Sequence, residues 1–248
     1  MGSDSFGESP PAIDVTLQEL VLEAAHFGEF LAGLAALAAT VLSHPGTRLS
    51  CGITVTRAKK PATVGGSDAG ARALEELQTE TRHGPGLSAI VEQATILVPD
   101  LNHEQRWPDL VHGASGRGVR SILSVPLPAE GKSRGVLTLY AKRVDAFSPD
   151  DLTTAQGFTR RASRVLRMAL RIAQLSEVRD DLTAAMHSRS RIDMALGMVM
   201  AQNRCSRDKA FRILEHAANT RETKLHQVAA SVIASVSGEK DISTHFNE

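Results

Sequence analysis

The sequence predicts an α+β fold in two parts: an antiparallel sheet flanked by helices, then a coiled-coil helix that leads into a bundle of three short helices. Segments with alternating apolar residues between positions 48 and 140 indicate strands. Apolar residues at helical spacing come before them, which indicates flanking helices. After Asp150 the chain contains no proline, and apolar residues recur every three or four positions. The chain beyond that point is therefore expected to be helical.

Length and composition limit the class of protein. The 248 residues suffice for one average domain and a smaller one. The hydrophobic share of 42% and the charged share of 23% are those of an ordinary folded protein. Basic and acidic residues balance at 28 each, so a preference for nucleic acid must come from local clusters. Two folded domains are expected.

The cysteines and the apolar runs bear on cellular location. Cys51 and Cys205 are too few for a disulfide framework and lack the CxxC spacing of zinc or redox sites. The polar N-terminus does not resemble a signal peptide. The longest apolar stretch, residues 30–42, is shorter than the roughly 20 residues that a membrane span needs. We expect a cytoplasmic protein with no membrane partner.

The first part of the chain begins with helices and continues with strands. Helical spacing over 17–42 predicts one long helix or two short ones, which a His-Pro-Gly turn at 44–46 ends. Alternation over 48–57 predicts a strand with Cys51 on its inward face. The further elements predicted are a helix at 68–77 and strands at 96–98, 120–127 and 134–140, with a hairpin turn at 129–132.

A long helix is predicted from Ser148. The Ser-Pro-Asp-Asp run at 148–151 supplies a cap, an early proline and carboxylates that the helix dipole favours. The apolar residues that follow step by four and three, interrupted by Arg179. This stripe fits either a coiled-coil seam or a single amphipathic helix that closes the first domain, and we favour the coiled coil after Ile172. The residues expected to hold a homodimer together are Val165, Met168, Ile172, Leu175 and Leu182.

Three amphipathic helices are predicted after Met186, where the apolar period changes. The first has its apolar face between residues 192 and 200, and Ser206 caps a second that carries apolar residues over 210–217. The third has its apolar face over 225–236. Such short helices must pack on one another to bury these faces.

The sequence gives no reason to expect catalysis. It lacks GxSxG, phosphate-loop and HExxH motifs, and its histidines have no metal-ligand spacing. Cys51 is expected to behave as a small hydrophobe. We assign no catalytic residue, no metal ligand, no cofactor and no ligand-binding residue.

Basic residues cluster in the last part of the chain. Residues 187–236 hold an excess of four basic over acidic side chains, which suits contact with phosphate but also occurs on plain helical surfaces. Upstream, four arginines share one helical face and are expected to face solvent or a partner subunit. These are Arg160, Arg164, Arg167 and Arg171.

A set of residues in the last part carries a resemblance to a known family: Ser188-Arg189, Ile192-Asp193, Ala195-Leu196-Gly197-Met198-Val199-Met200, Cys205, Ala210-Phe211, Leu214, Lys224-Leu225, Val228-Ala229 and Val232-Ile233. These residues resemble the ANTAR family of RNA-binding antitermination domains. The resemblance implies a three-helix domain that recognises paired hairpin loops in a leader RNA and prevents a terminator from forming. It also implies a dimer held by a preceding coiled coil.

The resemblance and the positions of basic residues together suggest which residues contact RNA. Lys224 begins the third helix, where free backbone N–H groups attract an anion, and Gly197 would allow a close approach. The residues expected to contact RNA are Arg189, Arg191, Gly197, Arg204, Arg221 and Lys224. Four positions depart from the family pattern and are expected to reduce the positive surface. They are Leu196, Glu215, Ala218 and Glu222.

A second, more diffuse resemblance covers the first 170 residues. It rests on His83-Gly84-Pro85-Gly86-Leu87, Val98-Pro99-Asp100-Leu101, Arg106-Trp107-Pro108, residues 118–127, residues 135–140 and Phe147-Ser148. This part looks like a GAF domain of the kind that precedes ANTAR in actinobacteria. The resemblance implies an antiparallel sheet that binds small molecules or dimerises, without identifying the ligand.

These observations give an expected organisation and function. We expect a disordered tail at 1–12, a GAF-like sensor at 13–172, a coiled-coil linker at 173–187, an ANTAR-like domain at 188–238 and a tail at 239–248. The function expected is a signal-responsive, dimeric RNA-binding regulator that acts by transcription antitermination. Two alternatives stay open: a DNA-binding helical regulator, and a GAF-fold methionine sulfoxide reductase, against which the single cysteine in the first domain argues.

Overall fold

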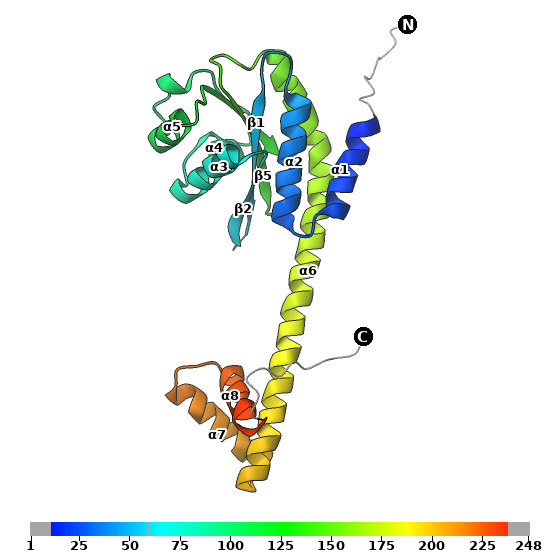
Figure 1. Ribbon diagram of the computed structural model, residues 1–248, viewed down its shortest axis with the longest axis vertical. Coiled ribbons are helices and arrows are strands. Elements are labelled where there is room, and N and C mark those ends of the chain that lie inside the picture. Colours follow the sequence, from blue (N-terminus) through cyan, green and yellow to red (C-terminus); the bar gives the residue numbers. More distant parts are fainter. Residues whose placement is uncertain (1–10, 59, 238–248) are drawn as a thin grey trace. The chain divides into compact units, whose positions relative to one another are not determined.

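The computed structural model describes residues 11–58 and 60–237 (Figure 1). This part of the chain divides into two compact units between Ala173 and Gln174. Most of the expected tails, 1–10 and 239–248, lies outside the described residues. Pro11 and Ala12, expected in the first tail, instead begin a helix. None of the described helices combines the length and the hydropathy needed to cross a membrane.

Unit 1 contains two helices, then a sheet with helices between its strands. Its elements are α1 (Pro11–Glu23), α2 (Phe27–Leu42), β1 (Leu49–Arg57), β2 (Lys60–Gly66), α3 (Ala69–Thr81), α4 (Pro85–Glu92), β3 (Ile96–Val98), the 3-10 helix η1 (Leu101–His103), α5 (Pro108–Ser115), β4 (Ser121–Leu127) and β5 (Arg134–Ala141). Helix α6 (Pro149–Asn203) begins in unit 1 and ends in unit 2, which also contains α7 (Arg207–Thr220) and α8 (Leu225–Ser237).

The five strands form one sheet in the order β2-β1-β5-β4-β3, and every neighbouring pair is antiparallel. Helices α1, α2 and the first part of α6 cover one face of this sheet, and α3, α4 and α5 cover the other (Figure 1). The expected antiparallel sheet with flanking helices is therefore confirmed.

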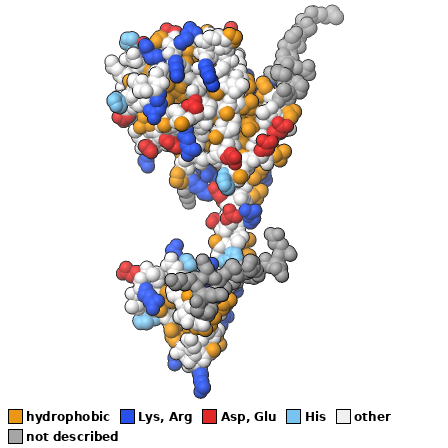
Figure 2. Space-filling view, viewed as in Figure 1, with side chains coloured by type: hydrophobic (Ala, Val, Ile, Leu, Met, Phe, Trp, Pro, Cys, Tyr) orange, Lys and Arg blue, Asp and Glu red, His pale blue; other side chains and the backbone are white. Residues whose placement is uncertain are grey.

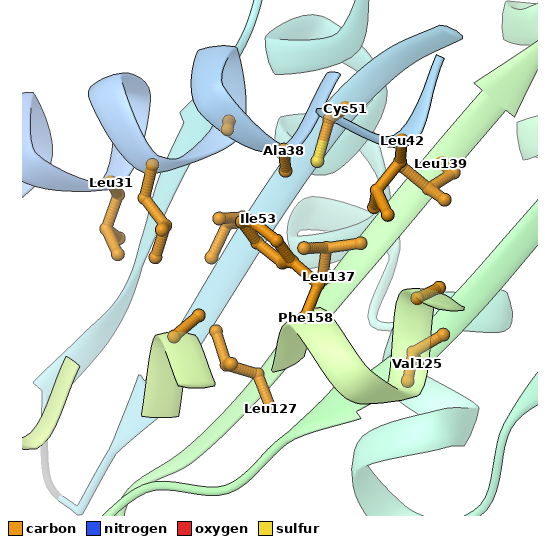
Figure 3. Packing of buried hydrophobic residues seen from close by; sticks show 14 of the residues in the cluster. Leu31, Ala38, Leu42, Cys51, Ile53, Val125, Leu127, Leu137, Leu139 and Phe158 are labelled. Carbon is orange, nitrogen blue, oxygen red and sulfur yellow. The ribbon is translucent and has the colours of Figure 1, made fainter. Parts of the chain in front are cut away.

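The face toward α2 and α6 carries the main apolar core. Because side chains alternate along a strand, Ile53 of β1, Leu137 of β5 and Val125 of β4 all point to this side. They pack against Leu31 and Leu42 of α2 and Phe158 of α6 (Figure 3). Each large side chain buried in this way contributes about 1.5–3 kcal/mol.

Cys51 is fully buried in the same core, as its place on the inward face of β1 predicts. Burial raises the pKa of its thiol well above the usual value, and the nearby carboxyls of Glu75 and Asp68 raise it further. Since the thiolate is the nucleophilic form, this cysteine is a poor nucleophile at neutral pH.

The opposite face of the sheet holds a buried polar network around Glu75 of α3. The hydroxyl of Tyr140 on β5 donates to Oε1 of Glu75 at 2.7 Å, and the hydroxyl of Thr54 on β1 donates to Oε2. Gln78 donates from Nε2 to the oxygen of Tyr140 at 3.0 Å and accepts from the N–H of Gly86 on α4 at 2.9 Å. Burial raises the pKa of Glu75, an effect that the hydrogen bonds to its carboxylate oppose.

Four elements of unit 1 are absent from the sequence prediction: β2, α4, η1 and α5. Strand β2 contains Pro61 and two glycines, which weaken a strand signal, yet an edge strand tolerates them. Helices α4 and α5 have only eight residues each and begin at Pro85 and Pro108, where proline suits the first turn.

Helix α6 is uninterrupted over its 55 residues. The change of apolar period after Met186 predicts a separate first helix for the C-terminal bundle, but the last turns of α6 take that role. The change of period marks a different apolar face on the same helix, not a break. The expected three-helix bundle thus consists of the end of α6, α7 and α8, with Ala195, Leu214 and Ala229 among its buried residues.

The polar network gives unit 1 a pH-dependent stability. Because folding raises the pKa of Glu75, the protonated Glu75 side chain contributes its full stability to unit 1 at pH values below the ordinary pKa of a glutamate. That contribution is lost as pH rises to the raised pKa. Glu75→Gln should remove this pH dependence, measured as the urea-unfolding free energy of unit 1 from pH 4 to pH 8.

Glu80→Gln, an exposed position on the same helix, is the matched control and should keep the pH dependence of the unaltered chain. Glu75→Ala should lower stability by about 2–4 kcal/mol, because two buried hydroxyls lose their acceptor. An unchanged pH dependence in Glu75→Gln would contradict the role assigned to this carboxyl.

Candidate nucleic-acid interface

The turn between α6 and α7 is closed by backbone hydrogen bonds typical of a helix C-cap. Arg204 adopts a left-handed conformation with φ of 46°, and the N–H of Cys205 donates to the carbonyl of Met200 at 3.3 Å. Ser206 then caps α7, its Oγ accepting from the N–H of Lys209 at 3.4 Å. This geometry fixes Arg204 at the end of α6 with its side chain exposed.

The turn between α7 and α8 repeats the motif. Glu222 has φ of 51°, and its N–H donates to the carbonyl of Asn219 at 3.2 Å. The N–H of Thr223 donates to the carbonyl of Ala218 at 3.0 Å. Lys224 immediately precedes α8, and its N–H donates to Oε1 of Gln227 at 3.3 Å. The first turn of α8 has no acidic residue, so the positive end of its helix dipole is not neutralised there.

The residues expected to contact RNA lie at three places in unit 2. Arg189, Arg191 and Gly197 belong to α6, whereas Arg204 lies in the first turn. The second turn, between α7 and α8, holds Arg221 and Lys224. Helix α7 has 14 residues, hence a length of about 20 Å, so the two turns lie at opposite ends of that helix. All of these residues are exposed except Arg191, which is half-buried.

Asp193 of α6 brings two arginines together. Its Oδ1 accepts from Nη2 of Arg207 at 2.6 Å, and its Oδ2 lies 4.0 Å from Nε of Arg189. Arg207 begins α7 and was not among the residues predicted to contact RNA. The sequence feature that could have identified Arg207 is its position directly after the Ser206 cap. Because the pairs are exposed, their contribution to stability is small.

Gly197 lies on the exposed side of α6, and a Cβ added there would meet no atom within 4 Å. Within the described residues, no other helix approaches this glycine closely, and close approach by RNA stays a prediction. An alanine would fit and would be more stable in a helix by about 1 kcal/mol.

Two departures from the family pattern do not affect the surface. Leu196 is 3% exposed and Ala218 is 6% exposed, and both pack in the apolar core of unit 2. The expectation that they reduce the positive surface needs correction, since a buried position contributes little surface charge. Glu215 and Glu222 are exposed, as that expectation requires.

Helix α7 also exposes apolar side chains beside basic ones. Phe211 is 40% exposed and Ile213 is 39% exposed, although the sequence pattern places Phe211 on the buried face. Lys209 and Arg212 are exposed on the same helix. Figure 2 shows apolar and basic side chains next to one another on unit 2.

The apolar stripe of α6 is exposed over the middle of the helix. Val165, expected in the dimer seam, is instead 7% exposed and packs in the core of unit 1, because that part of α6 covers the sheet. The other expected seam residues are exposed, with Leu175 at 65%. Val178, also 65% exposed, was missed because Arg179 was read as the stripe position. The exposed stripe consists of Met168, Ile172, Leu175, Val178, Leu182 and Met186.

Comparison with protein families assigns both parts of the chain. The GAF domain family model matches residues 14–167, more than half of the chain. The chain belongs to the GAF domain family. The ANTAR domain family model matches residues 180–233. The GAF domain lies within unit 1, and the ANTAR domain consists of the end of α6 with α7 and α8. Together the GAF and ANTAR domains are those of a signal-sensing, RNA-binding regulator.

Solved structures show similarity to about two thirds of this chain. An N-acylhomoserine lactone dependent LuxR family transcription factor, CepR2 from Burkholderia cenocepacia, is 18% identical, covering 66% of this chain and 99% of that one (TM-score 0.47). A free methionine-R-sulfoxide reductase from Neisseria meningitidis is 19% identical, covering 70% and 99% (TM-score 0.44). The GAF domain from Acinetobacter phosphoenolpyruvate-protein phosphotransferase is 13% identical, covering 65% and 98% (TM-score 0.44). No curated protein sequence matches significantly.

The two left-handed residues of the ANTAR domain give a test of its local stability. Glycine adopts positive φ without steric cost, so Arg204→Gly and Glu222→Gly should each stabilise α7 and α8 by about 0.5–1 kcal/mol. Arg221→Gly is the control, since Arg221 has φ of −95° and glycine there should destabilise. Hydrogen exchange of α7 and α8 amides in the full chain measures these changes. Faster exchange in both turn variants would contradict the assigned geometry.

Proposed function

We propose that this chain is a signal-responsive regulator that acts by transcription antitermination. Its ANTAR domain binds paired hairpin loops of a leader RNA, and the binding form is a homodimer. The observation that carries the proposal is the cluster of exposed cations at the turn before α8. Arg221 and Lys224 lie there beside a helix N-terminus that has no acidic residue in its first turn.

The electrostatics of this turn favour a phosphate group. Neither Arg221 nor Lys224 forms an ion pair with another described side chain, so both charges are available. The first backbone N–H groups of a helix have no acceptor within the helix and point toward an incoming anion. Glu222 between the two cations weakens attraction for any polyanion, which favours a ligand whose phosphates lie at particular positions.

The other exposed residues extend the surface beyond one phosphate. Arg204 has no ion-pair partner in the described part of the chain, and Gly197 leaves room for a close approach on α6. Phe211 presents part of an aromatic ring, which unpaired bases in a loop stack upon readily. Exposed cations at both ends of α7 and an exposed aromatic ring on that helix suit an RNA loop better than a regular duplex.

A second copy of the chain is proposed to cover the exposed stripe of α6. Six large apolar side chains along 19 residues repeat at helical spacing, and an isolated helix is not stable in water with such a face exposed. Pairing two identical stripes would bury each Leu or Ile side chain, worth about 1.5–3 kcal/mol per residue. Arg171 and Arg179, which are exposed on α6 beside the stripe, keep the edge of the seam polar.

Binding to RNA is tested with the double variant Arg221→Ala/Lys224→Ala. Loss of two charged contacts should weaken binding to a two-hairpin RNA at least tenfold. It should also reduce the slope of log affinity against log salt by about 1.5. Fluorescence anisotropy at several salt concentrations measures both quantities.

The control for this experiment is Arg160→Ala/Arg164→Ala, which removes two exposed arginines of α6 within the GAF domain. It should leave affinity and slope unchanged. Duplex DNA of equal charge is the comparison ligand, and tighter binding to the duplex would favour the DNA-binding alternative. Unchanged RNA binding by a folded Arg221→Ala/Lys224→Ala variant would refute the proposed interface.

Dimerisation is tested by introducing a charge into the stripe. Leu175→Asp should convert a dimer to a monomer at micromolar concentration, because a carboxylate cannot be buried in an apolar seam without a partner. Light scattering after size-exclusion chromatography gives the mass. Ala184→Asp, nine residues further and therefore on the opposite side of α6, is the control and should remain dimeric. A monomeric unaltered chain would exclude this role for the stripe.

A further inference from the structure

A cleft in unit 1 has features that no described function uses. It has a volume of about 390 Å³ and lies where the start of β1 and the end of β5 meet the N-terminus of α3 and the segment after α5. This volume is within the range of small-molecule sites, about 300–1,000 Å³. Tyr140, Leu74 and Val119 form its floor, and all three are buried.

The rim of the cleft is basic. Arg48, Arg117 and Lys142 line it together with one acid, Asp68. Asp68 already caps α3: its Oδ1 accepts from the N–H of Ala71 at 2.9 Å, and its Oδ2 accepts from Ser67 Oγ at 3.1 Å. Its carboxylate is therefore committed to the helix and does not pair with the three cations of the rim.

Strand register places two of these cations opposite each other. Leu49 of β1 pairs with Ala141 of β5, so Arg48 and Lys142 occupy facing positions one residue beyond that pair. Alternation puts both on the same side of the sheet as Tyr140. Like charges at facing positions of two strands repel each other. Within the described residues neither cation has an ion-pair or hydrogen-bond partner for its side chain.

The remaining groups of the cleft fit the apolar part of a ligand. The hydroxyl of Tyr140 is used inward on Glu75, so the cleft receives the ring and not the hydroxyl. The Nη1–H of Arg117 donates to the carbonyl of Gly113 at 2.7 Å, which holds the Arg117 side chain at the rim of the cleft. The cleft thus combines an aromatic and aliphatic floor with an uncompensated positive rim.

We propose that this cleft binds a small organic anion, with its negative group between Arg48 and Lys142 and its apolar body against Tyr140 and Leu74. The class comprises amphipathic carboxylates, phosphates and sulfonates small enough for the cleft. Binding neutralises the repulsion between the facing cations, so the ligand stabilises the folded GAF domain. This site is separate from the proposed RNA interface, and either can be absent without affecting the evidence for the other.

The test uses 1-naphthoate as the probe and the full chain in isothermal titration calorimetry. Saturable binding at one site per chain is expected, weakening as salt is raised. The uncharged analogue 1-naphthylmethanol should bind at least tenfold more weakly, and acetate, which lacks the apolar body, likewise. Equal affinity for the charged and uncharged probes, or no saturable binding of 1-naphthoate, would overturn the proposal.

Variants locate the site. Arg48→Ala/Lys142→Ala should weaken 1-naphthoate binding at least tenfold, whereas Arg160→Ala/Arg164→Ala, outside the cleft, should leave it unchanged. Lys142→Glu places opposite charges at the facing positions, so it should raise the Tm of the unliganded chain and abolish binding of the probe. Binding that survives Lys142→Glu in a folded protein would show that the probe lies elsewhere and would refute the assignment.

Discussion

The alternation of side chains along β1 and β5 is the constraint on which the GAF domain depends. Both strands are buried on both faces, so neighbouring residues such as Ile53 and Thr54 enter different environments. A slip of one residue would put hydroxyls into the apolar core and aliphatic side chains against Glu75. The same register brings Arg48 opposite Lys142 at the strand ends. Core, polar network and basic cleft are therefore consequences of one pairing.

Helix α6 supplies residues to two separate cores. Residues up to Leu170 pack against the sheet, and residues from Ala195 onward pack with α7 and α8. Between them Ile172, Leu175, Val178, Leu182 and Met186 belong to neither core and are exposed. Helical propensity alone gives little stability to such a segment in water, since most helices in proteins are stabilised by packing of an apolar face. This is the physical reason for proposing a second copy against the middle of α6.

The sequence predicts features that local patterns determine and misses those that depend on distant contacts. Alternation placed Cys51 inside, and the cap at Ser206 began α7 where expected. Nothing local marks Glu75 as buried, because its partners Thr54 and Tyr140 come from other parts of the chain. The candidate RNA residues were predicted from charge and family pattern, but their separation along α7 and the pairing of Arg207 with Asp193 required the structure.

The ANTAR domain contains three residues that stabilise its fold less than other residues would at the same positions. Gly197 lies in a helix where alanine would fit, and Arg204 and Glu222 occupy left-handed positions where glycine would be favoured. Together these choices cost on the order of 2–3 kcal/mol, a large share of the stability of a small bundle. Packing among the described residues does not require them, which is compatible with the RNA contact proposed above. Under the proposed function, Gly197 leaves room for the RNA and Arg204 attracts it. Glu222 weakens the attraction of the domain for polyanions of the wrong shape.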